Sequence, residues 1–290
     1  MTVGNFDGVH LGHCKILAAV KLQAERLSVP STVVIFEPQP REYSLDVPPP
    51  RLTGLREKVR LILAQGIDHV LCMRFDEDLK HLRAESFIEQ VLVDAIGARC
   101  VVVGDDFRFG SGREGDYHLL ETCSVDYGFS LEPVATISDG QERISSTRIR
   151  EALGRDDFDL ASKLLGRPYT LTGRVARGQQ LGRQLGFPTA NMVVGQHQLP
   201  LNGVFAVRLQ LPDGQSSQGI ANIGKRPTIG DLEKPILEVH ILDYEGDIYG
   251  RRITVEPVCK LREEKTFESL DQLKAAIKKD YDTARKFFAS

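Results

Sequence analysis

The residues best suited to phosphate chemistry lie in the run Gly4-Asn-Phe-Asp-Gly-Val-His-Leu-Gly-His13. Apolar residues recur behind this run with a helical period, which predicts a strand end, a tight glycine turn and the opening of a helix. Such a turn directs backbone N–H groups and the positive end of the helix dipole at one point, which suits a phosphate. His10 and His13 project from the same side of the first helical turn, and Gly12 leaves the backbone open to a nucleotide. The alternative is a helix that merely begins with two histidines, and the preceding Gly-x-Phe-Asp-Gly favours the phosphate site.

The elements that must position this turn follow from the pattern of the first half. Strand-like apolar runs alternate with helical patterns, which predicts βαβ units and a parallel sheet. We expect strands at 31–36, 69–75 and 100–104 and helices at 55–65 and 85–96. Ligands of such sheets bind beyond the carboxyl ends of the strands. The loops at that edge are 5–13, 37–41 and 105–115.

The loop from Gly104 to Gly115 holds four glycines, two arginines and two phenylalanines directly after a strand. This composition suits a flat aromatic ligand that carries charge, and a long surface loop with incidental charges is the alternative. Further on, Ser145-Ser-Thr-Arg-Ile-Arg150 leads into a helix expected at 151–153. Hydroxyls and arginines at a helix start predict a second anion-binding element. A plain N-cap with exposed arginines is the alternative interpretation.

The second half has a different pattern. A helix expected at 155–165 ends at Gly166-Arg-Pro168. Alternating strand-like runs joined by turns follow at 169–175, 203–211 and 236–242. Short strands with no helix between them predict an antiparallel barrel. A final helix is expected from apolar residues that share one face: Leu270, Leu273, Ile277, Tyr281 and Ala284.

Two places in this half could do chemistry. In an extended segment Thr189 and Asn191 face the same side, and their hydroxyl and amide oxygens can bind Mg²⁺ carried on ATP. The alternative is a glycine-rich turn with a proline. Glu238 lies between Leu237 and Val239, which share an apolar face, so its carboxylate points to the other side. It is either a solvated carboxylate or the base for a primary hydroxyl.

Composition limits the function classes. The chain has 290 residues, enough for two domains, and its 41% hydrophobic and 27% charged residues are typical of a globular protein. A net charge of −3 gives no overall attraction to nucleic acid or anionic membranes, and no run reaches membrane-spanning length. The five cysteines form no Cys-x-x-Cys pair, so we expect neither a disulfide framework nor a zinc site. Buried thiols at Cys72 and Cys100 and a cytoplasmic location are expected.

Together, the motifs of the first half resemble the HIGH-type nucleotidyltransferase superfamily, and more closely the FMN adenylyltransferase half of the bacterial bifunctional riboflavin kinase/FAD synthetases. The matching segments are 4–13, 104–110 and 144–150. The resemblance implies a Rossmann-like domain in which His10 and His13 stabilise charge on the α-phosphate of ATP while FMN attacks and pyrophosphate leaves. It places further residues at the ATP phosphates: Gly4, Asp7, Gly12, Ser145, Ser146, Thr147 and Arg150. It places three residues at the flavin: Asp106, Phe107 and Phe109.

The second half is similar to the riboflavin kinase module of the same family. The similarity rests on the run from Gly182 to Asn191, on Asn222-Ile-Gly224 and on Leu237-Glu-Val-His240. It implies a six-stranded antiparallel β-barrel with a C-terminal helix, and a Glu238 that accepts the proton of the ribityl 5′-hydroxyl. Thr189 and Asn191 would hold Mg²⁺ and ATP. Three more residues follow from the resemblance, with Gly178 and Gly186 at the ATP and Arg262 on the flavin side.

The resemblance covers nearly the whole chain and implies two domains, 1–165 and 166–290. We expect a cytoplasmic bifunctional enzyme: riboflavin and ATP give FMN and ADP, and FMN and ATP then give FAD and pyrophosphate, with Mg²⁺ as the metal. Two alternatives stay open, a riboflavin kinase with a degraded adenylyltransferase half and a non-catalytic flavin-binding regulator. Small-molecule substrates are the expected partners, without nucleic acid or membrane. The sequence leaves the oligomeric state open.

The first strand is expected to be truncated. Only Met1, Thr2 and Val3 precede the first motif, whereas members of the family usually carry a longer segment there. A missing central strand would leave neighbouring backbone groups unpaired and would hold the histidines less firmly.

Overall fold

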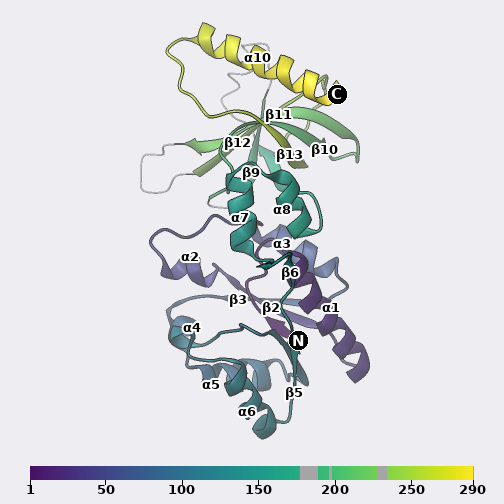
Figure 1. Cartoon of the computed structure of the whole chain (residues 1–290), viewed down its shortest axis with the longest axis vertical. Coiled ribbons are helices and arrows are strands. Elements are labelled where there is room, and N and C mark those ends of the chain that lie inside the picture. Colours follow the sequence, from purple (N-terminus) through teal and green to yellow (C-terminus); the bar gives the residue numbers. More distant parts are fainter. Residues whose placement is uncertain (177–188, 196–197, 227–233, 290) are drawn as a thin grey trace. The chain divides into compact units, whose positions relative to one another are not determined.

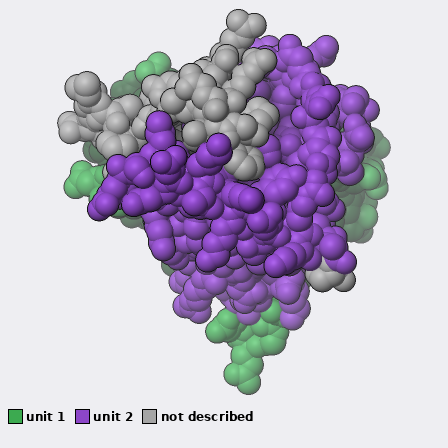
Figure 2. All heavy atoms as spheres, turned by 90° about the horizontal axis from the view of Figure 1, so that it is seen from above, with its two compact units in different colours: residues 1–49, 55–145 green, residues 50–54, 146–290 purple. Residues whose placement is uncertain are grey.

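The computed structural model describes residues 1–176, 189–195, 198–226 and 234–289, and its elements are labelled in Figure 1. Contacts within the chain divide it into two compact units, which Figure 2 distinguishes. Unit 1 comprises residues 1–49 and 55–145, and unit 2 comprises residues 50–54 and 146–290. Each unit has hydrophobic core clusters of its own.

Parallel strands form the centre of unit 1. Strands β1 (Thr2–Val3), β2 (Thr32–Glu37) and β3 (His69–Arg74) pair in that order, and β4 (Cys100–Gly104) pairs with β5 (Ser130–Val134). Backbone hydrogen bonds of Met1 join the two sets. The Val102 N–H donates to Met1 O at 2.8 Å, and the Met1 ammonium donates to Cys100 O at 2.7 Å. The chain at β1 is therefore hydrogen-bonded towards both β2 and β4.

Helices cover both faces of these strands. Alternate residues of a strand point to opposite faces, so Val33 and Ile35 pack with α1 and α3, whereas Val34 packs with α5, η1 and α6. Val102 and Val103 divide in the same way. The covering helices are α1 (Leu11–Leu27), α3 (Leu55–Leu63), α5 (Ala84–Phe87), the π-helix η1 (Ile88–Ala95) and α6 (Tyr117–Tyr127). This layered arrangement agrees with the predicted Rossmann-like unit.

Shorter elements lie in the connections of unit 1. They are α2 (Pro40–Ser44), α4 (Glu77–His81), the 3-10 helix η2 (Ser111–Arg113) and the hairpin of β6 (Ser138–Asp139) and β7 (Glu142–Arg143). The helix expected at 85–96 exists but takes π geometry from Ile88. The prediction that Cys72 is buried is wrong, because β3 is an edge strand and leaves this thiol exposed, whereas Cys100 is buried.

Unit 2 is built on a closed antiparallel barrel. Its strands are β8 (Leu171–Ala176), β9 (Ala190–Val194), β10 (Gly203–Gln210), β11 (Ser216–Arg226), β12 (Lys234–Ile241) and β13 (Arg252–Arg262). They pair in the order β10-β11-β12-β9-β8-β13, and β13 closes on β10. The six-stranded antiparallel barrel predicted for the second half is confirmed.

In the described part of unit 2 the helices are α7 (Ser146–Gly154), α8 (Phe158–Leu165) and α10 (Leu270–Ala289). Helix α10 is the predicted closing helix, and it lies along the barrel in Figure 1. Its Ala284 packs with Val204 and Ile220. Helix α7 begins at Ser146 rather than at 151, so the hydroxyls of the Ser-Ser-Thr run lie at and inside its first turn. No helix in the described ranges is long and apolar enough to cross a membrane.

Leu17→Ala should lower the free energy of unfolding of unit 1 by about 2–5 kcal/mol, because the Leu17 side chain is fully buried in the core beneath α1. Leu22→Ala on the same helix is the matched control. Its side chain is 54% exposed, and the expected change is within about 0.5 kcal/mol. Urea unfolding followed by circular dichroism measures both variants. Equal losses would contradict the packing of α1 on the sheet.

Candidate functional site

The turn between β1 and α1 has an unusual backbone. Phe6 and Val9 have φ angles of 47° and 41°, and Gly8 between them has a φ of 83°. Positive φ is costly for residues other than glycine, above all for a β-branched valine. Phe6 and Val9 are both buried in the core of unit 1. Their burial holds the backbone in this shape, so the predicted glycine turn is fixed by its apolar side chains as well.

The two histidines lie side by side at the start of α1. His10 is the N-cap, and its Nδ1 accepts a hydrogen bond from the His13 N–H at 3.3 Å. The two rings stack with centroids 3.6 Å apart and 17° between their planes, and Phe6 packs against His13 at 5.0 Å. Because Nδ1 of His10 is an acceptor, the proton of a neutral His10 ring lies on Nε2.

Gly12 lets the His10 ring and the backbone of Ile144 lie close to the start of α1. A Cβ at this position would lie 3.1 Å from Nδ1 and Cε1 of the His10 ring and 3.6 Å from Ile144 O. Any side chain would therefore press on the His10 ring. The structure thus brings the histidine turn next to the segment that leads to Ser145, as the sequence motifs predict for one phosphate site.

Gly4 and Asp7 are more deeply built into the turn. The Gly4 N–H donates to Val34 O at 3.0 Å, so it is used by the sheet. A Cβ on Gly4 would lie 3.1 Å from the Phe6 ring. Asp7 is only 3% exposed. Both residues therefore shape the turn that presents the histidines.

The loop after β4 is fastened by ion pairs and hydrogen bonds. Both guanidinium Nη atoms of Arg143 donate to the Asp106 carboxylate, one of them at 2.9 Å. The Thr136 hydroxyl donates to Asp105 at 2.6 Å, and this hydrogen bond is the main reason that the pKa of Asp105 lies below its ordinary value. The predicted flavin residue Asp106 is thus half of an exposed Arg–carboxylate pair.

A cavity of about 390 Å³ lies at this loop. Phe107 lines it together with Arg108, Arg113 and Tyr117. The Phe107 and Phe109 rings stack with centroids 5.4 Å apart. Phe109 is 8% exposed and belongs to the core. Of these two predicted flavin residues, Phe107 is the one that faces the cavity and Phe109 supports it from below.

The Ser-Ser-Thr-x-x-Arg residues divide between the units. Ser145 is the last residue of unit 1, whereas Ser146, Thr147 and Arg150 belong to unit 2. Arg150 Nε donates to Pro50 O at 2.6 Å.

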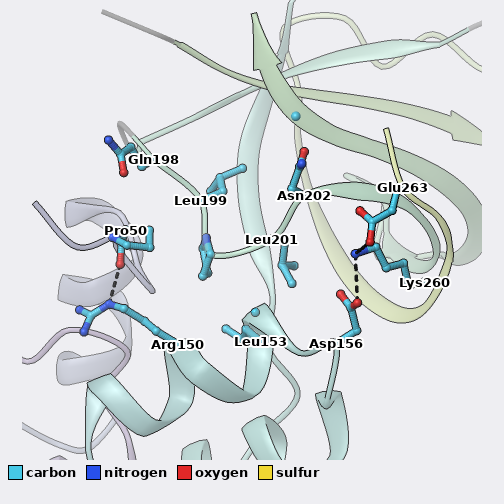
Figure 3. A pocket seen from close by; sticks show the side chains of 13 residues that line it. Pro50, Arg150, Leu153, Asp156, Gln198, Leu199, Leu201, Asn202, Lys260 and Glu263 are labelled. Carbon is cyan, nitrogen blue, oxygen red and sulfur yellow. Dashed lines mark hydrogen bonds and ion pairs between the residues drawn. The ribbon is translucent and has the colours of Figure 1, made fainter. Parts of the chain in front are cut away.

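Arg150 also lines a cavity of about 500 Å³ in unit 2, shown in Figure 3. On another wall of this cavity Lys260 Nζ lies 3.0 Å from Asp156 and 2.9 Å from Glu263. These two carboxylates raise the pKa of Lys260, although burial, the largest single effect, opposes them. The cations of this cavity are therefore engaged by the protein itself.

Strand register aligns the predicted kinase residues across the barrel. Glu238 on β12 is the partner of Asn191 on β9 and of Asn222 on β11. Asn222 is in turn opposite Val204 on β10, which is opposite Arg262 on β13. Directly paired residues point to the same face. We call these five residues the barrel row, and each of its polar members is half-buried.

The barrel row lies on the outer face, where α10 packs. Val204 and Ala284 of α10 share a hydrophobic cluster. His240, two residues after Glu238, has its ring 6.0 Å from the Tyr281 ring of α10. Leu237 and Val239 are buried on the opposite side of the strand. The predicted sidedness of Glu238 is confirmed.

Arg262 ends the row in a strong ion pair. Its Nε lies 3.0 Å from both carboxylate oxygens of Asp280 on α10, and Nη2 lies 2.9 Å from one of them. The guanidinium also lies 5.5 Å from the centre of the Phe267 ring. Asp280 is 6% exposed. Arg262 is therefore held in a fixed position at the β13 end of the barrel row.

Oxygen donors at the other end of the row suit Mg²⁺. Asn191 and Glu238 are paired on adjacent strands, and Thr189 lies two residues before Asn191. Among the residues that the structure describes, no group of three or more His, Cys, Asp or Glu side chains could hold a metal. A site with few protein oxygens fits Mg²⁺ that shares its coordination with nucleotide phosphates. Gly178 and Gly186 lie outside the described residues.

Sequence reasoning missed the partners that hold these side chains. Arg143 and Asp280 hold Asp106 and Arg262 from 37 and 18 residues away along the chain. No spacing rule marks such pairs. Asn222 lies in a recognised motif, but its position beside Glu238 depends on the register of the β11–β12 hairpin.

Comparison with known proteins agrees with this two-part organisation. A family model described as FAD synthetase matches residues 1–148, and one described as riboflavin kinase matches residues 165–288. A Pseudomonas fluorescens protein named bifunctional riboflavin kinase/FMN adenylyltransferase is 48% identical, over 99% of this chain and 92% of its own length. An Escherichia coli K12 protein of the same name is 46% identical over the same shares.

A solved structure shares the fold over nearly the whole chain. It is the crystal structure of a Streptococcus pneumoniae protein named macrolide-efflux protein, with a TM-score of 0.78 and 29% sequence identity. The match covers 98% of this chain and 93% of that one. The likeness concerns the fold, and macrolide efflux belongs to the name of that protein alone.

Proposed function

This chain belongs to the bifunctional riboflavin kinase/FMN adenylyltransferase family, and on that premise we propose which residues carry each reaction. It phosphorylates riboflavin with ATP to FMN and adenylylates FMN with ATP to FAD and pyrophosphate. Riboflavin, FMN and ATP are thus its small-molecule substrates. The two alternatives, a kinase alone and a non-catalytic regulator, are not favoured, since both family models match. The single observation that carries the residue proposal is the pairing of Glu238 with Asn191 in the barrel row.

In the kinase reaction Glu238 is the general base. Its carboxylate accepts the proton of the ribityl 5′-hydroxyl as that oxygen attacks the γ-phosphorus and ADP leaves. Glu238 is half-buried, on the face of the barrel that carries α10. Arg262, which Asp280 holds in place, is proposed on the flavin side of the row on the family resemblance. Gly178 and Gly186 are proposed at the ATP on the family resemblance.

Thr189 and Asn191 would hold Mg²⁺ together with ATP. Their hydroxyl and amide oxygens are ligands of the kind that Mg²⁺ prefers. When bound, the ion offsets the negative charge of the phosphates and of the attacking oxygen. The β9–β12 pairing places Asn191 next to Glu238.

In the adenylyl transfer His10 and His13 stabilise the charge that develops on the α-phosphate as the FMN phosphate attacks it. This catalysis needs no side-chain nucleophile, since positioning and charge stabilisation suffice. Gly12 leaves room for the His10 ring, and Gly4 and the buried Asp7 are built into the turn. The other proposed ligands of the ATP phosphates are Ser145, Ser146, Thr147 and Arg150. The proposed flavin residues are Asp106, Phe107 and Phe109, with Phe107 at the cavity.

We further propose that the chain consists of the domains 1–165 and 166–290 and that it is located in the cytoplasm. The family models leave residues 149–164 between them unmatched. Limited proteolysis with mass mapping tests the boundary, and cuts confined to other connections would contradict it.

The five cysteines are all free, which suits a reducing compartment. Cell fractionation tests the location, and recovery outside the cytoplasm would contradict it.

Glu238→Gln should lower FMN formation by about 10²–10⁴-fold, because the amide cannot accept the proton of the attacking hydroxyl. Conversion of added FMN to FAD should stay at the wild-type rate. Chromatography of the flavins after incubation with Mg²⁺ and ATP measures both. Glu256→Gln is the matched control, since this β13 carboxylate lies outside the barrel row. Unchanged FMN formation in Glu238→Gln would refute the assignment of the base.

His13→Ala should lower FAD formation from FMN by about 10²–10³-fold, because it removes a donor placed at the developing phosphate charge. FMN formation from riboflavin should not change. His81→Ala is the control, since its side chain is 64% exposed in the same unit and does not line the cavity at Phe107. Loss of both reactions in a folded His13→Ala protein would contradict the separation of the two sites.

Asn191→Ala should raise the Mg²⁺ concentration that gives half-maximal kinase activity several-fold, because one oxygen ligand is lost. The Mg²⁺ dependence of FAD formation from FMN should stay the same. Val193→Ala, an exposed position on the same strand, is the control. An unaltered Mg²⁺ dependence of the kinase reaction in Asn191→Ala would exclude this residue from the metal site.

A further inference from the structure

Asn222 is a polar residue of the barrel row that has no established task. Its Oδ1 atom is buried, and it has no hydrogen-bond partner among the residues that the structure describes. The residue as a whole is only half-buried. A buried amide oxygen without a hydrogen-bond partner lowers stability by about 1–3 kcal/mol. Such an atom in a folded protein therefore suggests a missing partner, such as a water or a ligand.

The neighbours of Asn222 define what could satisfy it. Glu238 lies on one side of it and Val204 on the other. Val204 offers no polar atom. A carboxylate oxygen cannot donate a hydrogen bond when ionised, so Glu238 cannot satisfy Oδ1. The missing partner is therefore a donor that comes from outside the row.

The order of the row matches the order of groups along riboflavin. Neighbouring strands lie about 4.8 Å apart, so Asn222 is one such step from Glu238 and Arg262 is three steps, about 14 Å. In the proposed site the 5′-hydroxyl reacts at Glu238, and the family resemblance implies that the flavin ring lies on the side of Arg262. The secondary hydroxyls of the ribityl chain then pass over Asn222.

We propose that Asn222 binds the ribityl chain of riboflavin, with Oδ1 accepting a hydrogen bond from one of its secondary hydroxyls. This proposal rests on the proposed roles of Glu238 as the base and of Arg262 on the flavin side, because together they fix which part of the ribityl chain lies beside Asn222. The contact holds the 5′-hydroxyl at the carboxylate. It also selects for a polyhydroxylated side chain, since a flavin without the donor leaves the buried oxygen unpaired.

A double-mutant cycle between enzyme and substrate tests the contact. Wild type and Asn222→Ala are assayed with riboflavin and with three analogues that lack the 2′-, 3′- or 4′-hydroxyl. We expect Asn222→Ala to lower kcat/KM for riboflavin about tenfold, which corresponds to one hydrogen bond of about 1.4 kcal/mol. For one analogue the two enzymes should then be equally active. Additive losses for all three analogues would overturn the proposal.

Controls separate this result from misfolding and from failure of the base assignment. Gln218→Ala, an exposed position on β11, should leave all the ratios unchanged. FAD formation from FMN and the melting temperature report on the fold, and Asn222→Ser replaces the alanine variant if that one does not fold. Full kinase activity in Glu238→Gln would refute the base while the cycle still reports on Asn222. If Glu238→Gln is inactive as a kinase but the cycle shows no coupling for any analogue, only the ribityl contact is refuted.

Discussion

Strand register in the closed barrel is the constraint on which the proposed kinase site depends. Glu238, Asn191 and Asn222 become neighbours only through the pairing of three strands, and a slip of one residue would turn each side chain to the other face. Two glycines allow neighbouring strands of the barrel to approach closely. A Cβ on Gly173 would lie 2.4 Å from Val193 O, and one on Gly219 would lie 2.6 Å from His240 O. Closure of the barrel then leaves no strand free to slide.

Unit 1 positions its histidines by a different principle. Here a strained turn is held by burial, because Phe6 and Val9 keep positive φ angles while their side chains fill the core beneath α1. Positive φ in such residues is stable only where the surroundings over-determine it. The N-cap hydrogen bond and the ring stacking then fix His10 against His13. One site is thus set by backbone pairing and the other by core packing.

Local patterns in the sequence predicted the parts of the structure that depend on local physics. The alternation of Leu237, Glu238 and Val239 gave the correct face of β12, and helical periodicity gave α10. Local patterns do not predict contacts between distant segments, such as the ion pair of Arg262 and Asp280. The exposure of Cys72 was also missed, because an apolar run does not tell an edge strand from a central one.

The two units differ in whether their sheets have free strand edges. The barrel has no free edge, since β13 closes on β10. The sheet of unit 1 ends at β3, whose Leu71 and Cys72 are exposed. An open edge of this kind is a template for strand addition, and an exposed thiol on it can cross-link two chains under oxidising conditions. Within the described part of the chain, the strand edges that could accept a further strand therefore belong to unit 1.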